Sequence, residues 1–186
     1  AEQFTGKVIA VFDGDTVLVA RSNGPPVKVR LAGIDAPEVV HAGMGSKPPN
    51  SQRTQQGCMA AKSSLSELAL HRQVSVDSLA TDSYGRLVAH LAVDGKSINE
   101  EQIRRGMAWE YSGYHSNEAY TALQNEAQQA KRGLWAQGNP TPPWEWRKQH
   151  PDKGAPRRAA DPGCGNKKYC SEMSSCEEAR HYLTQC

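Results

Sequence analysis

The chain has 186 residues, of which 38% are hydrophobic and 23% charged, a composition that suits one globular domain with a small appendage. Its mean hydropathy of -0.67 and its short, interrupted apolar runs argue against a membrane span, which needs about 20 apolar residues. The net charge of +2 is too small to indicate a nucleic-acid-binding protein by itself.

Alternating hydrophobic residues predict five strands, near residues 7–13, 15–21, 26–34, 73–79 and 86–94. The first two strands meet at Asp13-Gly14, a typical hairpin turn in which glycine supplies a positive φ. Asp15 follows directly, where a strand would favour threonine or a hydrophobic residue. The turn therefore explains Asp13 and Gly14 but gives no reason for Asp15.

Three helices are predicted from apolar spacing. The first covers about 58–72, after a glycine- and proline-rich loop; the second covers 98–106, with Asn99 as its cap and Gly106 as its end. The third covers 116–132 and ends at Gly133. Three strands, a helix, two strands and further helices form an α+β order. A five-stranded, partly open antiparallel barrel of the OB type, an OB-fold with about three helices, suits this order.

Beyond the barrel, we expect a change of organisation. The predicted domain occupies 1–146, a basic proline-rich linker 147–163, and a cysteine-rich tail 164–186. Trp144 and Trp146 are expected to dock on the domain, because exposed tryptophans are costly in water. Residues 131–168 carry a charge of +6, which is typical of a solvated linker but could also hold phosphates loosely.

Four of the five cysteines crowd the last 23 residues, namely Cys164, Cys170, Cys176 and Cys186. Their spacing differs from the paired cysteines of zinc modules and favours two disulfides, for which three pairings are possible. Disulfides indicate an oxidising compartment, so we expect a secreted or periplasmic protein whose signal peptide has been removed. Cys58, on the first helix, is expected to be a buried free thiol.

Charged residues gather at the strand ends and on one polar strand face, where a barrel presents a site. These are Asp15, Arg30, Asp35, Glu38 and Arg86. The carboxylates of Asp15 and Asp35, with the carbonyl of Ala36, are hard oxygen ligands of the kind Ca²⁺ prefers, whereas zinc would call for histidine or cysteine. Taken singly, each aspartate is more often a turn former or a surface residue.

The two arginines change this interpretation. Guanidinium groups bind phosphate in a bidentate fork, so Arg30 and Arg86 beside a metal describe a pocket for a phosphodiester. Glu38 would then take a proton from an attacking water. Taken singly, each arginine fits an ordinary surface salt bridge.

Five stretches, "DGDT", "VRLAGIDAPE", "DSYGRL", "INEEQIRRGMA" and "KRGLW", occur in the order and spacing of the thermonuclease family of staphylococcal nuclease-like domains. The chain resembles this family from about Lys7 to Trp146. With its cysteine-rich tail, it resembles the secreted bacterial members that carry such an extension.

The resemblance implies a Ca²⁺-dependent endonuclease of OB-fold that hydrolyses DNA and RNA, preferably single strands, at the P–O5′ bond and leaves 3′-phosphates. We expect it to act as a monomer. Matched residue by residue, the motifs imply metal ligands at Asp15, Asp35 and Ala36, an outer carboxylate at Asp13, phosphate clamps at Arg30 and Arg86, a general base at Glu38, and substrate contacts at Tyr84 and at Tyr111 or Tyr114.

The chain departs from the best-known member in three places. Ser83 replaces a lysine before the tyrosine of the "YGR" motif, so the resemblance does not carry over the phosphate contact of that lysine. Ala36 replaces a threonine, which costs little if the backbone carbonyl is the ligand. The loop from Val39 to Gly57 is longer, which could alter access to the site.

Two rival interpretations remain. OB barrels often bind single strands without cutting them, and some nuclease-like repeats have become binding modules. A degenerate module would have lost some of the five charged residues of the site, and all five are present. Alternatively, the basic segment and the cystine tail are the functional part and anchor the enzyme to a surface or partner.

Overall fold

The computed structural model describes residues 2–39, 54–111 and 117–150. In these ranges the strands are β1 Gln3–Val11, β2 Thr16–Ala20, β3 Val27–Leu31, β4 Ile34–Asp35, β5 Gln73–Thr81, β6 Leu87–Val93, β7 Lys96–Ser97 and β8 Trp109–Glu110. The helices are α1 Cys58–Ala69, α2 Ile98–Arg104, α3 Glu118–Gln129, the 3-10 helix η2 Gly133–Gln137, and α4 Pro143–Gln149.

Five strands form a closed barrel in the order β3-β2-β1-β5-β6, and a pairing between β3 and β6 closes it. That last pairing is parallel, with Val29 opposite Leu87 and Leu31 opposite Ala89, whereas the other barrel pairings are antiparallel. Register shifts in the β1–β2 and β5–β6 pairs bend the long strands, as bulges do. The predicted α+β barrel is confirmed, but it is closed rather than partly open.

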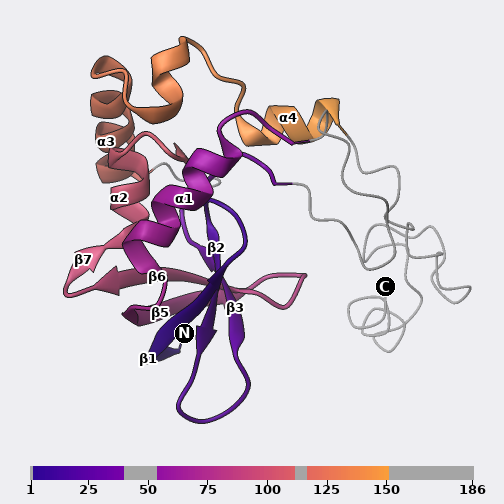
Figure 1. The fold of residues 1–186 in the computed structure, drawn as a ribbon, viewed down its shortest axis with the longest axis vertical. Coiled ribbons are helices and arrows are strands. Elements are labelled where there is room, and N and C mark those ends of the chain that lie inside the picture. The colour runs from indigo at the N-terminus through magenta and orange to yellow at the C-terminus, as the bar shows by residue number, and fades with distance from the viewer. Residues whose placement is uncertain (1, 40–53, 112–116, 151–186) are drawn as a thin grey trace, which may run out of the picture. The chain divides into compact units, whose positions relative to one another are not determined.

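Alternating residues fill the barrel, which is why the strand predictions lie within a few residues of the observed bounds. The core includes Val8, Val17, Val29, Leu31, Val74, Val76 and Leu91, all buried. Helix α1 covers one end with Ala61 and Leu65, and the other helices gather toward the same end (Figure 1). The exception is the predicted strand 26–34, which breaks at Gly33 with φ of 73°, so that Ile34–Asp35 forms a separate pairing with β8.

The cap of helix α2 differs from the prediction. Ser97, not Asn99, is the N-cap, and its hydroxyl accepts a hydrogen bond from the Glu100 N–H at 3.2 Å. Asn99 is instead fully buried: its Oδ1 accepts from Leu91 N at 3.0 Å and its Nδ2 donates to Ala32 O at 2.9 Å. The asparagine therefore ties α2 to the barrel rather than capping the helix. Gly106 follows this helix with φ of 71°, as predicted.

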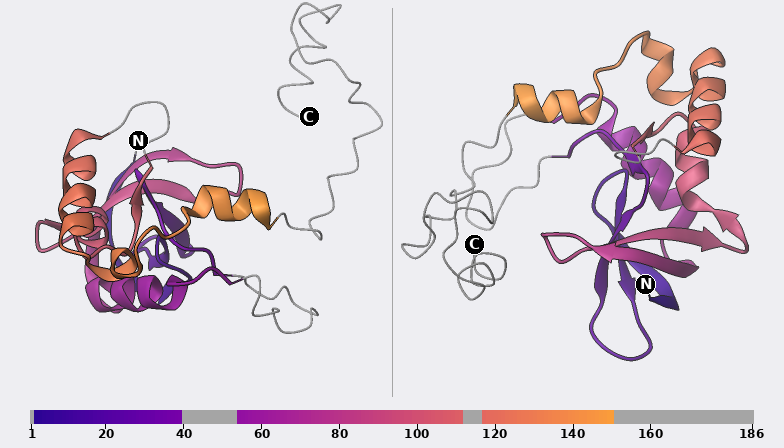
Figure 2. Two further views of the ribbon diagram at one scale, coloured as in Figure 1. Left: turned by 90° about the horizontal axis from the view of Figure 1, so that it is seen from above. Right: turned by 180° about the vertical axis from the view of Figure 1, so that it is seen from behind.

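The segment predicted as the start of the linker is partly helical. Helix α4 continues through residues 147–149, beginning with Pro143 in its first turn, where the missing N–H costs nothing. Trp144 docks on the domain as expected, stacked on Tyr111 with ring centroids 5.2 Å apart. Trp146 stacks instead on His150, at the end of its own helix, at 3.8 Å. Figure 2 shows α4 set apart from the α2–α3 pair.

Several predictions lie outside the described residues: the rest of the linker, the cysteine-rich tail with its disulfides, Tyr114, and residues 40–53 of the long loop. Cys58 is described, and it is a buried free thiol at the start of α1, as expected. No helix in the described ranges has both the length and the apolar character that crossing a membrane requires.

Candidate active site

The turn between β1 and β2 places Asp15. The Oδ1 of Asp13 accepts from the Asp15 N–H at 3.0 Å, an arrangement typical of aspartate at turns, and Phe12 N donates to Thr16 O at 2.9 Å. Gly14 is not among the glycines with positive φ, so the predicted reason for that glycine was wrong. A Cβ at Gly14 would lie 2.6 Å from the Ala61 Cβ, so the position needs a small residue for space.

Asp15 and Asp35 come together at the end of the barrel. The Ala36 N–H donates to Asp15 Oδ2 at 2.9 Å, and the Thr16 hydroxyl donates to Asp15 Oδ1 at 2.9 Å. Asp35 belongs to β4 and is only 1% exposed, whereas most aspartates lie at the surface. Two buried carboxylates, those of Asp15 and Asp35, therefore lie near each other at this end of the barrel. The Ala36 N–H and the Thr16 hydroxyl hold the Asp15 carboxylate in place.

Arg30 bridges these two carboxylates from the polar face of β3. Its Nη2 lies 2.8 Å from Asp35 Oδ1 and 3.5 Å from Asp15 Oδ2, and its Nη1 donates to Ile34 O at 3.2 Å. Burial lowers the pKa of Arg30, but the charges of Asp15 and Asp35 outweigh this and raise it. The guanidinium therefore stays charged in a half-buried place.

The carboxylates of this cluster carry more negative charge than the arginines neutralise. Burial and the charge of Asp15 raise the pKa of Asp13 to about 7. Burial also raises the pKa of Asp35, against the lowering effect of a hydrogen bond from Arg147. Four carboxylates, those of Asp13, Asp15, Asp35 and Glu38, gather about the guanidinium groups of Arg30 and Arg147. Such an excess favours an added cation.

Arg147, on α4, was not predicted to belong to the site. Its Nη2 lies 2.7 Å from Asp35 Oδ2, its Nη1 lies 3.3 Å from Asp35 Oδ1, and the same Nη1 hydrogen-bonds the Glu38 carboxylate. Arg147 was not recognised in the sequence, because it follows a proline-rich stretch in a run of basic residues and was assigned to the predicted linker. Its position one turn beyond the docked Trp144 was the available signal.

Arg86 stands on the turn between β5 and β6, and no contact joins it to Asp15, Arg30 or Asp35 among the described interactions. Asp82 holds it instead: the Asp82 Oδ1 accepts from Arg86 N at 3.0 Å, and Oδ2 accepts from Arg86 Nε at 2.8 Å. Although burial raises the pKa of Asp82, these hydrogen bonds lower it below its ordinary value. Asp82 was not predicted to belong to the site, although its place before Ser-Tyr-Gly is typical of a turn-forming aspartate.

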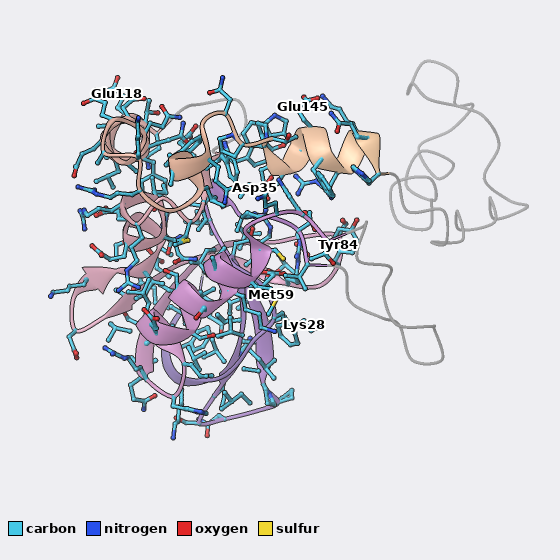
Figure 3. The ribbon with its side chains drawn as sticks, turned by 45° about the horizontal axis from the view of Figure 1, so that its top comes forward. Lys28, Asp35, Met59, Tyr84, Glu118 and Glu145 are labelled. Atoms are coloured by element: carbon cyan, nitrogen blue, oxygen red, sulfur yellow. The ribbon has the colours of Figure 1, made fainter. Side chains whose placement is uncertain are left out.

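The predicted tyrosines differ in their surroundings. Tyr84 is 83% exposed, and the Arg86 guanidinium lies 5.3 Å from its ring centroid. Figure 3 places Tyr84 at the turn between β5 and β6, and Asp35 beneath α4. Tyr111 has one ring face against Trp144, whereas Tyr114 lies outside the described residues.

The donor set fits a hard divalent cation. Within the described ranges, no three histidine, cysteine, aspartate or glutamate side chains form a ready metal cluster. Two buried carboxylates, Asp15 and Asp35, are nevertheless held on one arginine, next to the backbone of Ala36. Oxygen donors of this kind suit Ca²⁺, whose coordination shell water and substrate oxygens commonly complete.

A groove elsewhere on the barrel does not compete for this chemistry. It encloses about 710 Å³, with Phe4, Val76, Leu91 and Tyr120 among its lining residues, and none of the predicted site residues lines it. Asp77, His90 and Glu100 also line this groove, but no arginine or lysine does, so its lining offers no cation to hold a phosphodiester.

Comparison with known proteins agrees with the motifs. Residues 28–137 match the family described as "Staphylococcal nuclease homologue". An "Uncharacterized endonuclease" of Escherichia coli O157:H7 is 36% identical over 143 residues, which cover 76% of this chain and 84% of the relative. A protein of the same description from Haemophilus influenzae is 35% identical over 148 residues, 80% of this chain and 75% of the relative. The "Staphylococcal-like nuclease CAN1" of Arabidopsis thaliana is 35% identical over 121 residues, 65% of this chain and 33% of the relative.

Proposed function

Since the chain belongs to the staphylococcal nuclease homologue family and is a nuclease, we propose that it is a Ca²⁺-dependent enzyme that hydrolyses both DNA and RNA. The proposed cleavage breaks the P–O5′ bond and leaves 3′-phosphates. The observation that carries this proposal is the pair of buried carboxylates, Asp15 and Asp35, that share one guanidinium of Arg30.

Asp15, Asp35 and the Ala36 carbonyl would hold the Ca²⁺, with Asp13 acting through water, and the ion would offset the charge of the phosphate. Arg30 binds a non-bridging phosphate oxygen from the polar face of β3, where Asp35 keeps its guanidinium in place. Arg86, fixed by Asp82, neutralises charge that develops on the phosphate and on the departing O5′.

Glu38 supplies the base in this proposal. Its carboxylate takes a proton from a water as the water oxygen bonds to phosphorus, and the electron pair of the broken P–O5′ bond leaves with O5′. A general base accelerates a reaction roughly 10²- to 10⁴-fold, and one charge-stabilising donor lowers the barrier by about 3 to 4 kcal/mol. Enzymes commonly lower the activation barrier by about 8 to 23 kcal/mol, so no single residue is sufficient. The arginines and the base are needed together.

The exposed ring of Tyr84 supports the preference proposed for single strands. A nucleobase stacks on an open aromatic face only when it is not paired in a duplex. The exposed Tyr84 lies beside Arg86, which is proposed to bind the phosphate. We further propose that the protein works in an oxidising compartment, periplasmic or extracellular. The four cysteines of the last 23 residues support this location.

One assay tests the function. The purified chain is expected to degrade single-stranded DNA and RNA oligonucleotides with added Ca²⁺ and to stop when a chelator is present. Product ends identified by mass spectrometry are expected to be 3′-phosphates. Full activity in the chelator, or in the double variant Asp35→Ala with Arg86→Ala, would refute the mechanism.

A binding module would give a different result in the same assay. It would retain the oligonucleotide in a filter-binding measurement without shortening it, with or without Ca²⁺. Retention without cleavage by the unaltered chain would therefore support the rival interpretation and contradict ours.

A further inference from the structure

The backbone of Glu38 is fixed by a glutamine that also holds the segment before α4. Gln55, which is buried, accepts from Glu38 N through its Oε1 at 3.1 Å, and its own N–H donates to Glu38 O at 3.1 Å. Its Nε2 donates to Thr141 O at 2.6 Å. The residue therefore links the chain at Glu38 to the chain that leads into α4, and neither link has a part in the mechanism described so far.

Arg147 makes a second connection between the same two parts of the chain. Its guanidinium forms a fork on Asp35, at 2.7 and 3.3 Å, and hydrogen-bonds the Glu38 carboxylate. Because the guanidinium is planar and rigid, contact with both acids fixes the Glu38 carboxylate relative to Asp35. A lysine at this position could supply the charge but not the fork.

The packing of α4 on the domain fixes the position of the Arg147 guanidinium. Trp144 stacks on Tyr111 at 5.2 Å with an angle of 23° between the rings, and Pro143 is buried. Arg147 follows Trp144 by three residues, so both lie on neighbouring parts of the helix surface. The docked helix α4 therefore holds the guanidinium in place beside Asp35 and Glu38.

A role in stability alone does not account for this contact. The pair with Glu38 joins side chains that are 41% and 37% exposed, and ion pairs with that access to water contribute little to the free energy of folding, whereas the pair with the buried Asp35 contributes more. The contact nevertheless joins the two acids that the proposed reaction uses most directly. Its consequence is geometric: it limits where the Glu38 carboxylate can point.

We propose that Arg147 is a positioning residue of the nuclease, which holds the Glu38 carboxylate beside Asp35 in the orientation that accepts the proton of the attacking water. Helix α4 and Gln55 form its support. This inference rests on the function proposed above for Glu38.

Steady-state kinetics of the full chain on one single-stranded oligonucleotide, with Ca²⁺, test the inference. Arg147→Met is expected to lower kcat by roughly 10- to 100-fold, as misplaced catalytic groups do, with KM little changed. Arg147→Lys is expected to recover part of the loss. The matched control is Lys148→Met on the same helix, whose ion pair is with Glu145, and it is expected to leave kcat unchanged.

A double variant shows whether Arg147 acts through Glu38. In a Glu38→Gln background, Arg147→Met is expected to cause no further loss, because the carboxylate that it positions is gone. A further loss in the double variant, or a rise in KM without a fall in kcat, would show that Arg147 binds the substrate itself and would overturn the inference. An unchanged kcat in Arg147→Met would also overturn the inference, because the contact of Arg147 with the two acids would then be an ordinary ion pair.

Two further measurements separate this inference from the function on which it rests. Calcium affinity of Arg147→Met, measured by calorimetry, is expected not to weaken; a weaker affinity with lost activity would place the effect in the metal site and contradict our inference. If thermal unfolding shows that Arg147→Met does not fold, Arg147→Lys replaces it, because lysine keeps the charge and loses the fork. A kcat of Arg147→Lys equal to that of the unaltered chain would then overturn the inference. Full activity of Glu38→Gln would refute the base itself, whereas a slow Glu38→Gln with a fully active Arg147→Met would refute only the positioning role.

Discussion

At the scale of single residues, the site is defined by acids placed where a folded chain seldom tolerates them. Asp15 and Asp35 are buried, and the partly buried Asp13 accepts a hydrogen bond from the Asp15 N–H. Arginines offset only part of this charge, so the metal-free site carries a cost that a bound cation would remove. The acids that make this site costly to fold are thus the ones that would favour a bound cation.

Asp13 is expected to make the stability of the folded chain depend on pH. Its folded pKa of about 7 exceeds its ordinary value of 3.8, so between pH 4 and 7 the folded chain keeps a proton that the unfolded chain has released. Metal-free stability is therefore expected to fall as pH rises through this window and to level off above it. Asp13→Asn keeps an oxygen for the Asp15 N–H and removes the charge, so its stability is expected to change less across the window.

Thermal unfolding from pH 4 to 8 in a chelator measures this effect. At pH 8 the Asp13→Asn variant is expected to be more stable than the unaltered chain by on the order of 1 kcal/mol, allowing for partial exposure. Added Ca²⁺ is expected to raise the Tm of the unaltered chain more than that of the variant. Asp94→Asn, in an exposed turn, is the control. Equal pH profiles for Asp13→Asn and the unaltered chain would show that Asp13 is not the group responsible.

At the scale of elements, the site depends on where turns and helices touch. The turn at Gly14 meets α1 and the chain after β4: a Cβ there would lie 2.6 Å from the Ala61 Cβ and 2.7 Å from the Ala36 Cβ. Gln102 of α2 donates from Nε2 to Gly14 O at 2.7 Å and to Ala61 O at 3.2 Å. Two helices thus hold the turn that carries Asp15.

Gly14→Ala tests this contact. The added methyl group must displace the turn or α1, which is expected to cost about 1–3 kcal/mol in the free energy of unfolding, as overpacking does. Because Asp15 is the next residue, kcat is expected to fall as well. The measurements are chemical denaturation and steady-state kinetics.

Gly24→Ala is the matched control for that variant. A Cβ at Gly24 meets nothing within 4 Å, although its φ of 115° strains any other residue, so only stability is expected to fall. If Gly14→Ala kept full kcat despite its lower stability, the turn would not be what positions Asp15.

The elements also show what the sequence could and could not predict. The barrel strands followed from alternation because their inner faces are apolar along their whole length, as Val17, Val29 and Val76 illustrate. Asp15, Arg30 and Asp35 could be grouped because they stand at strand ends or on a polar face that the barrel brings together. The N-cap of α2 was misassigned because asparagine caps helices and also binds buried backbone, and only packing decides between the two.

Contacts across long sequence separations could not be derived in this way. Arg147 lies 112 residues after Asp35, and Gln55 lies 86 residues before Thr141, in stretches that carry no periodic pattern. Their roles depend on how α4 docks, through Trp144 on Tyr111. The indoles of the proline-rich stretch predicted that docking, but not which charged side chain it would deliver.

At the scale of the whole molecule, the contacts that the structure describes at the site lie in one part of the chain, residues 2–150. Every contact among Asp15, Arg30, Asp35, Glu38 and Arg147 is made there. A chain that ends at His150 is therefore expected to keep the kcat and KM of the full chain. If instead the basic segment beyond it grips the substrate, KM would rise, and the rise would grow with salt, because phosphate contacts weaken with ionic strength.

A chain that ends at Asn139 is the informative comparison. It retains the buried Leu134 and Trp135, so the barrel is expected to fold, but it lacks Thr141, Trp144 and Arg147. Loss of kcat in this chain, together with a Tm near that of the chain ending at His150, would show that α4 serves the site rather than the fold. Equal kcat in the two truncated chains would mean that the barrel alone orients Glu38, since nothing after Asn139 would then contribute to the reaction.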